Sequence, residues 1–355
     1  MAAPAGESFP AVLVIGAGLA GSLLALALRE RGLAVTLLDQ GEGPSPSAAS
    51  SATELSYGVV PGWPLATTPL ARLAARAGAH WRALQRRHGP LGWHPARLRL
   101  PVPLPVSQVD GAVLGQKLPG VLAAAGVELR RGRALALQRS GSPWTVSLRE
   151  GPPLLAGQVV LAAGSGCRAL WPALPPRLCS SWAGVLQLQE RPPALAADQL
   201  LLPRQFQRLA LERRVGQLET EAWVVDPGLV PRGSGALVGQ LTLVGPAPDR
   251  EPDPLVMERR LRLGLEPLAL EWQGVAAHYR QARVSFCSEG EPLAGPVSGA
   301  PGLWAFTGFS GGFVQVPVLA PLLAQALGPA GELAVAAQRR LRQLGVWPSA
   351  PVGGG

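Results

Sequence analysis

The chain has 355 residues, 47% of them hydrophobic, with a formal net charge of +9. This length fits one large α/β protein or two closely joined domains, and it can bury a substantial core. Lys117 is the only lysine and the arginines are scattered. We therefore interpret the basic charge as a compositional bias and not as a nucleic-acid surface, which would cluster its cations.

Cysteine usage and the first residues indicate the compartment. Cys167, Cys179 and Cys287 are far apart and odd in number, which argues against a disulfide framework and against a zinc site. No metal is expected. Residues 1–10 lack the basic and apolar regions of a signal peptide. The apolar stretch 11–28 is interrupted by glycines, so we expect no membrane span. The sequence predicts a cytoplasmic protein.

The N-terminal stretch has the order of a dinucleotide-binding unit. Residues 11–15 are a continuous apolar run, which is typical of a strand buried on both faces. A glycine turn at 16–21 comes next, then a helix rich in Leu and Ala over 22–31. A second apolar strand over 34–38 ends on Asp39. Strand, glycine turn, helix, strand and terminal acid together predict a nucleotide site.

Each glycine of this turn has a physical role. Gly16 permits a tight turn, Gly18 lets backbone approach a pyrophosphate, and Gly21 lets the helix pack on the strand. The N-terminus of the helix favours the negative charge of the phosphates. Asp39 lies 39 − 16 = 23 positions after Gly16, near the ~20 expected for a carboxylate on the ribose hydroxyls. Gln40 follows it instead of an arginine, which disfavours a 2′-phosphorylated cofactor.

A loop rich in Ser, Gly and Pro follows Asp39, with hydroxyl side chains at Ser47, Ser50, Ser51, Thr53 and Ser56. One interpretation is a flexible surface loop. The other is a loop that folds over the cofactor and gives hydroxyl and N–H groups to it. The position directly after Asp39 favours the second interpretation.

The middle of the chain alternates helices and short strands before it returns to the nucleotide sheet. An amphipathic helix is predicted over 69–87, with His80 in a structural role, and an edge strand or crossover over 92–107. A helix over 116–125 ends at Gly126. Short strands are predicted near 127–129, 133–137 and 144–148. The buried strand 158–161 leads into a turn of small residues, where backbone can approach a cofactor.

Residues 176–289 have a different pattern, with period-2 runs between Pro and Gly turns. They predict an antiparallel sheet with strands at 182–188, 221–225 and 235–243, and a helix over 251–263. A strand over 303–306, a glycine turn over 307–313 and a helix over 314–327 follow. Pro317 and Pro321 are tolerable near the start of that helix but not deep inside it. A surface helix is predicted over 332–344, and a disordered tail over 353–355.

Four stretches, in order, resemble the D-amino-acid oxidase type of FAD-dependent oxidoreductases, the group with glycine oxidase and sarcosine oxidase. They are the unit 16–39 with its hydroxyl-rich loop, the strand and glycine at 160–164, the hairpin 229–239 with its Pro-Arg-x-Gly motif, and the C-terminal block. That block contains Ala282-Arg283, Pro292-Leu293-Ala294-Gly295-Pro296 and the glycine turn 302–312. The ordered set spans nearly the whole chain.

The resemblance implies an α/β fold, in which an FAD-binding Rossmann-like domain carries an inserted antiparallel-sheet α+β substrate domain. The expected FAD-binding domain is discontinuous and comprises residues 9–92, 116–175 and 290–345. The expected substrate domain comprises residues 93–115 and 176–289.

By the same resemblance, Arg283 matches the arginine that holds a substrate carboxylate, and a planar guanidinium is suited to that task. Tyr279 is a tentative second substrate residue, although core packing is an equally good interpretation. The predicted cofactor-binding residues are Gly16, Gly18, Leu19, Ala20, Gly21, Asp39, Gln40, Ser51, Thr53, Ala134, Ala163, Gly164, Gly308, Phe309, Ser310, Gly311, Gly312 and Phe313.

The chain departs from the family pattern near the proposed substrate arginine. Val284 stands where the family usually has proline, and the turn 288–290 has one extra residue. This leaves the substrate open. Some relatives attach the flavin to a cysteine in this region. Cys287 is offset from that position, so we expect non-covalent FAD.

The resemblance implies oxidation of a small amine or amino acid, with hydride transfer from the α-carbon to flavin N5 and hydrolysis of the resulting imine. The flavin is then reoxidised by O₂ or by another electron acceptor. No nucleic-acid partner is expected. Two alternatives stay open: a tRNA-modifying FAD oxidoreductase that acts on a modified uridine, and a flavin-binding protein without amino-acid turnover. A ring hydroxylase is disfavoured because the turn 307–310 lacks an acid.

Overall fold

The computed structural model describes residues 11–41, 51–99, 104–139, 143–193, 195–247, 249–266, 268 and 276–348. The first half contains β1 (Val12–Ile15), α1 (Leu19–Arg29), β2 (Val35–Asp39), β3 (Val59–Pro61), α2 (Pro69–Ala74), α3 (Ala77–His88), β4 (Trp93–Leu98), β5 (Leu104–Val109), α4 (Gly111–Ala124), β6 (Glu128–Arg131), β7 (Ala134–Arg139), β8 (Trp144–Leu148), β9 (Leu154–Ala156), β10 (Gln158–Leu161), η1 (Gly164–Gly166) and α5 (Cys167–Leu170). The second half contains β11 (Leu178–Leu188), β12 (Gln199–Leu200), α6 (Gln207–Arg213), η2 (Val215–Gln217), β13 (Ala222–Arg232), β14 (Gly235–Val244), α7 (Pro254–Gly264), β15 (His278–Cys287), β16 (Leu293–Pro296), β17 (Leu303–Thr307), α8 (Gly312–Leu327) and α9 (Glu332–Gln343).

Segments from both ends of the chain build one six-stranded sheet, in the order β16-β17-β10-β1-β2-β6. The strands β17, β10, β1, β2 and β6 pair in parallel, and β16 pairs antiparallel at the edge. The carboxyl ends of β1 and β17 therefore lie at the same edge of the sheet. In open α/β sheets this edge is where ligands bind.

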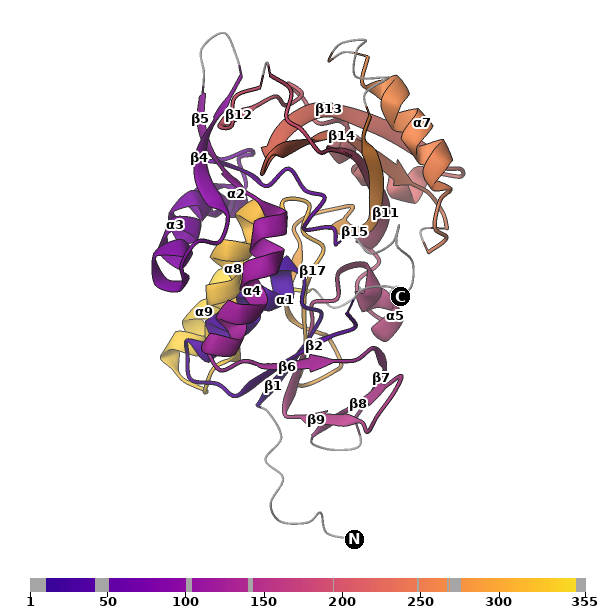
Figure 1. The fold of residues 1–355 in the computed structure, drawn as a ribbon. Helices are drawn as coiled ribbons and strands as arrows, with labels where there is room; N and C mark the ends of the chain where they lie inside the picture. Colours follow the sequence, from indigo (N-terminus) through magenta and orange to yellow (C-terminus); the bar gives the residue numbers. More distant parts are fainter. Residues whose placement is uncertain are drawn as a thin grey trace.

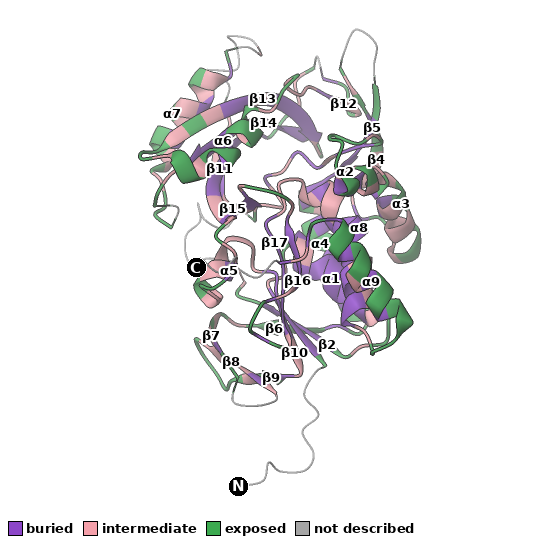
Figure 2. Ribbon diagram, turned by 180° about the vertical axis from the view of Figure 1, so that it is seen from behind, coloured by how far each residue is buried: buried purple, intermediate pink, exposed green. Residues whose placement is uncertain are grey.

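The continuous apolar strands are explained by the two layers that cover the sheet (Figure 1). Val12 and Val14 of β1 pack with the helices α1, α3, α4 and α8 on one face. Leu13 and Ile15 point to the other face and pack against the small sheet β7-β8-β9. Burial on both faces removes the polar alternation that a half-exposed strand needs. Figure 2 shows this buried centre in purple.

A second layered unit lies beyond the carboxyl edge of the first sheet (Figure 1). Its antiparallel sheet has the order β13-β14-β11-β15, and α7 packs on one face through Met257 and Leu261. The other face packs on the sheet β12-β4-β5-β3 and on Leu55 and Tyr57 of the hydroxyl-rich loop. The second unit therefore contacts the segment that follows the nucleotide-binding strands.

The predicted α/β fold class is confirmed, but several element boundaries were wrong. The helix expected over 69–87 is divided into α2 and α3, with a break at residues 75–76. The helix expected to begin at 116 begins at Gly111, because the Asp110 side chain accepts from Ala112 N and Val113 N and caps it. The stretch 92–107, predicted as an edge strand or a crossover, contains two strands, β4 and most of β5, that pair antiparallel.

Helix α8 passes through both prolines, against expectation. A proline at 317 cannot donate to the carbonyl of Phe313, four residues earlier. The indole N–H of Trp81 donates to that carbonyl at 2.7 Å instead. The carbonyl is thereby satisfied, and α3 is tied to the start of α8.

The predicted domain bounds stay a prediction. Ser47, Ser50 and the tail 353–355 lie outside the described residues. Among the helices that the structure describes, none combines the length and the hydrophobicity needed to cross a bilayer.

Candidate active site

The N-terminal glycine turn forms an open cradle at the end of β1. Gly16 has φ = 107°, and a Cβ on it would lie 2.6 Å from the carbonyl oxygen of Ala162, so this position requires glycine. A Cβ on Gly18 would meet nothing within 4 Å. Gly18 is the N-cap of α1, and its neighbours in the helix start present backbone N–H groups there. This arrangement fits an anionic pyrophosphate.

At the end of β2, Asp39 is exposed and lies opposite Arg131 of β6 in the strand register. The Arg131 guanidinium packs on the segment after Asp39, and an ideal Cβ on Gly41 would lie 2.7 Å from Arg131 Nε. Arg131 could not be predicted from the sequence, because only the pairing of β2 with β6 brings it opposite Asp39. Asp39 lines the cavity at the end of β2, and its role towards ribose hydroxyls stays a prediction.

The hydroxyl-rich loop folds over the start of α1. Leu19 N donates to Thr53 Oγ1 at 3.3 Å, and Glu54 N donates to Ser51 Oγ at 3.2 Å. The described part of the loop therefore favours the cofactor-loop interpretation over a free surface loop.

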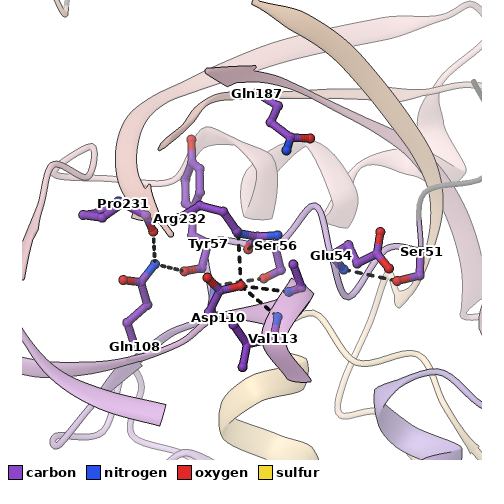
Figure 3. Close-up of polar contacts among 12 residues, drawn as sticks. Ser51, Glu54, Ser56, Tyr57, Gln108, Asp110, Val113, Gln187, Pro231 and Arg232 are labelled. Atoms are coloured by element: carbon purple, nitrogen blue, oxygen red, sulfur yellow. Dashed lines mark hydrogen bonds and ion pairs between the residues drawn. The ribbon is translucent and has the colours of Figure 1, made fainter. Parts of the chain in front are cut away.

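A buried polar network fixes the loop to the second sheet (Figure 3). Arg232 of the predicted Pro-Arg hairpin donates to Ser56 O at 3.1 Å, and its Nε lies 3.5 Å from Asp110 Oδ1. Gln108 Nε2 donates to Tyr57 O and to Pro231 O, both at 3.1 Å. Asp110 caps α4 at the same time, so one network joins the loop, the helix and the hairpin.

The C-terminal glycine turn lies directly beside the first one. An ideal Cβ on Gly312 would lie 3.2 Å from Leu19 Cδ2, which shows how closely α8 and α1 begin. Gly308 has φ = 82° and follows β17. Thr307 Oγ1 donates to Gly164 O at 3.4 Å, so the turn after β10 joins them. Three turns of small residues thus meet at one edge of the sheet.

Cys287 lies next to this turn. An ideal Cβ on Gly308 would be 2.7 Å from Cys287 Sγ. Burial raises the pKa of the Cys287 thiol to about 11. The neutral thiol is a weak nucleophile, and this fits the expectation of non-covalent FAD.

The turns open into one cavity of about 2720 Å³, well above the ~300–1,000 Å³ of an ordinary ligand pocket. Of the predicted cofactor residues, Gly21 alone is not among those lining it. A Cβ there would overlap the carbonyl oxygen of Gly16, so Gly21 serves the packing of α1 on β1. The residues that line the cavity are Gly16, Gly18, Leu19, Ala20, Asp39, Gln40, Ser51, Thr53, Ala134, Ala163, Gly164, Gly308, Phe309, Ser310, Gly311, Gly312 and Phe313.

Arg283 also lines the cavity, but its guanidinium already has partners. Nη2 donates to Ser165 O at 2.8 Å, and Nη1 lies 2.7 Å from Asp249 Oδ1. The Asp249 side chain is 84% exposed, against 23% for Arg283. The exposed Asp249 carboxylate therefore occupies Nη1 of Arg283, the arginine that was predicted to bind a substrate carboxylate.

Tyr279 is not among the residues that line the cavity. Its hydroxyl donates to Gln281 Oε1 at 3.1 Å, and its ring packs in the cluster under α7 with Met257. The packing interpretation fits this position, and nothing in the geometry supports a role in substrate orientation. Further along the same strand β15, Ala282 and Arg283 do line the cavity.

Two charged residues at the cavity wall were missed. Arg208 and Glu212 lie one turn apart on α6, a helix that was not predicted from the sequence. Arg208 Nη2 donates to Ser310 O at 2.8 Å, which places α6 beside the C-terminal turn. Burial raises the pKa of Glu212, while Arg208 and a hydrogen bond from Ser310 oppose that shift. In the part of the chain that is described, no three acidic, His or Cys side chains form a metal site.

Residues 11–103 match the family DAO, described as FAD dependent oxidoreductase. The chain carries the FAD-binding fold of the D-amino-acid oxidase type. The resemblance predicted from the motifs is confirmed, and with it FAD as the cofactor and an oxidoreductase as the class of protein. No curated protein matches the chain.

Solved structures match over nearly the whole chain. Glycine oxidase from Geobacillus kaustophilus has 16% identity and a TM-score of 0.70, with 98% of this chain and 100% of that chain covered. Iminodiacetate oxidase from Chelativorans sp. BNC1 has 18% identity and a TM-score of 0.67, with 90% and 96% covered. L-proline dehydrogenase from P. horikoshii has 12% identity and a TM-score of 0.67, with 95% and 99% covered. At such identities the likeness is one of fold.

Proposed function

We propose that this FAD-dependent oxidoreductase oxidises a small amino acid or amine inside the cavity between the two sheets. The observation that carries the proposal is the continuity of that cavity, which joins the glycine turns to charged side chains of the second unit. The similar structures include a glycine oxidase, an iminodiacetate oxidase and an L-proline dehydrogenase. Their substrates share an amine next to a carboxylate, and this supports the same class here.

The chain's own residues suit both parts of this task. Gly18 and the start of α1 would hold the pyrophosphate, and Asp39 the ribose. Residues 308–312 would bring backbone beside the flavin ring, and the positive end of α8 favours negative charge there. Bound FAD would supply the electron acceptor for a hydride from the substrate's α-carbon. The protein then contributes orientation and electrostatics.

Arg283 is the proposed site for the substrate carboxylate. Its Nη1 would exchange Asp249 for the ligand, and its bond to Ser165 O would keep the guanidinium in place. Exposed ion pairs contribute only about 0–1 kcal/mol, so a substrate carboxylate that also makes other contacts can displace Asp249.

Anaerobic mixing of the FAD-loaded protein with amino acids, N-methyl amino acids and imino acids tests the proposal. Loss of the oxidised flavin absorbance with at least one compound is the expected result. A protein that is reduced by dithionite but by no compound of the panel would instead be the flavin-binding protein without amino-acid turnover. O₂ and artificial acceptors are then compared as oxidants of the reduced enzyme.

A further inference from the structure

Three charged side chains from two elements form a group beside the C-terminal turn, and two of them, Arg208 and Glu212, line the cavity. Arg208 and Glu212 come from α6, and Asp226 comes from β13. Asp226 caps α6, because its two carboxylate oxygens accept from Gln207 N at 2.6 Å and from Arg208 N at 3.1 Å. Glu212 and Asp226 both interact electrostatically with Arg208, so this group has an excess negative charge when both carboxylates are ionised.

The hydrogen bonds within this group are incomplete. Arg208 Nη2 donates to Ser310 O, but its Nε has no hydrogen-bond partner among the described residues. Glu212 Oε1 also lacks a hydrogen bond in the described part of the chain, although its side chain is only 3% exposed. These two atoms form an ion pair at 3.9 Å, a distance that is too long for a hydrogen bond. A buried carboxylate oxygen left this way is costly unless a donor reaches it.

We propose that Glu212 is the group that receives the substrate's amine, whose N–H donates to Oε1, beside the turn 308–312. This inference rests on the proposed function and names a recognition residue for it. A cationic amine supplies both missing elements, a donor for Oε1 and a positive charge against the two carboxylates. Asp226 has both oxygens occupied by backbone N–H groups, so the amine goes to Glu212.

The geometry also separates this role from a structural one. A glutamate that only stabilises a helix pairs directly with an arginine four positions away and needs no further donor. Glu258 on α7 is such a residue: its Oε1 lies 2.7 Å from Arg262 Nη2, and it does not line the cavity. Glu258 provides a matched control for Glu212, because both pair with an arginine four positions away on a helix.

The experiment compares affinities of isosteric ligands for the FAD-loaded wild type, Glu212→Gln and Glu258→Gln. The pairs are glycine with propionate, N-methylglycine with butyrate, and proline with cyclopentanecarboxylate. Binding is measured anaerobically from the change in flavin absorbance. For a compound that reduces the flavin, affinity is taken from the concentration dependence of the reduction rate.

In the wild type and in Glu258→Gln, we expect the amine of at least one pair to bind with an affinity about tenfold or more above that of its isostere. In Glu212→Gln this preference falls by about tenfold, while the isostere keeps its affinity within about twofold. If Glu212→Gln does not fold, Glu212→Asp tests the same point. The aspartate keeps the negative charge, but its shorter side chain moves the carboxylate away from the proposed position of the amine. We expect Glu212→Asp to lower the preference for the amine over its isostere in the same pair of ligands.

Several outcomes would overturn the assignment. They are a preference unchanged in the Glu212 variants, an equal loss for both members of a pair, and no preference for the amine in the wild type. The failure of the proposed function has a different signature, since no amine would then reduce the flavin of any variant. Flavin reduction with an unchanged amine preference in Glu212→Gln would refute only the role of Glu212.

Discussion

At the residue scale, the partner of a side chain decides what its charge can do. Arg283 was predicted to hold a substrate carboxylate, and its Nη1 lies 2.7 Å from the exposed Asp249 carboxylate. Asp249 therefore competes for the position that we propose for the ligand. The competition is weak, because an exposed ion pair contributes little.

Replacing Asp249 by Asn removes this competing charge. We expect the affinity for carboxylate ligands such as propionate to rise by about twofold to fivefold, since an exposed pair is worth about 1 kcal/mol or less. Asp198→Asn is the matched control, because Asp198 is an exposed carboxylate 2.7 Å from Arg97 and does not line the cavity. Equal affinities in wild type and Asp249→Asn would contradict the exchange at Arg283.

The site residues that could be predicted from the sequence are set by local backbone geometry. Those that could not be predicted are set by the pairing of distant elements. Gly16 and Gly308 could be predicted, because each is required by a local turn. Glu212 could not, because the start of α6 is set by Asp226 of β13, whose carboxylate accepts from the first N–H groups of the helix. Arg131 is near Asp39 only through the register of β2 with β6. Local geometry is encoded locally, whereas charge partners depend on the fold.

At the element scale, Gly18 tests the assignment of the nucleotide cradle. Its φ of −66° is accessible to any residue, and a Cβ there meets nothing within 4 Å. Gly18→Leu should therefore fold, while its side chain occupies the space proposed for the pyrophosphate. We expect the affinity for FAD to fall by about tenfold or more. A fluorescence titration of the apoprotein with FAD measures it.

Gly120 supplies the control for that substitution. It is an exposed glycine of α4, and a Cβ there also meets nothing within 4 Å. Gly120→Leu should bind FAD as the wild type does. If both variants bind FAD with wild-type affinity, the pyrophosphate does not lie at Gly18.

Trp81 shows how an element boundary can be set from outside the element. Its indole N–H satisfies the carbonyl that Pro317 cannot, so α8 continues through a residue that usually ends helices. This compensation is invisible in the sequence, because Trp81 and Phe313 are far apart in the chain. We had expected prolines to be tolerated only near the start of this helix, and the hydrogen bond from Trp81 explains why α8 continues past Pro317.

Replacing Trp81 by Phe leaves the Phe313 carbonyl without this donor. We expect a loss of about 1–3 kcal/mol in the free energy of unfolding, measured by urea denaturation of the FAD-loaded protein. Trp223→Phe changes a ring that is 40% exposed and should cost within about 0.5 kcal/mol. Equal losses in the two variants would show that the bond to α8 does not matter.

At the scale of the whole molecule, two buried thiols link stability to pH. Burial raises the pKa values of Cys167 and Cys287 from 9.0 to about 11. The folded protein holds these protons more tightly than the unfolded chain does. The stabilisation is present below pH 9.0 and is lost as the pH rises through the folded-state pKa.

We expect the free energy of unfolding to fall between about pH 9 and 11, with a slope of up to about 1.4 kcal/mol per pH unit for each thiol. The double variant Cys167→Ala with Cys287→Ala should show a shallower slope, whatever its stability at pH 7. Urea denaturation across this pH range measures both. Identical slopes would contradict the link between the thiols and stability.

The central claim is that one FAD joins the N-terminal glycine turn to the C-terminal one, with the charged wall of the second unit above it. A crystal structure of the FAD complex tests this most directly. It should place the pyrophosphate at Gly16 and Gly18 and the isoalloxazine against residues 308–312. Electron density for FAD elsewhere, or a flavin ring turned away from residues 308–312, would contradict the account.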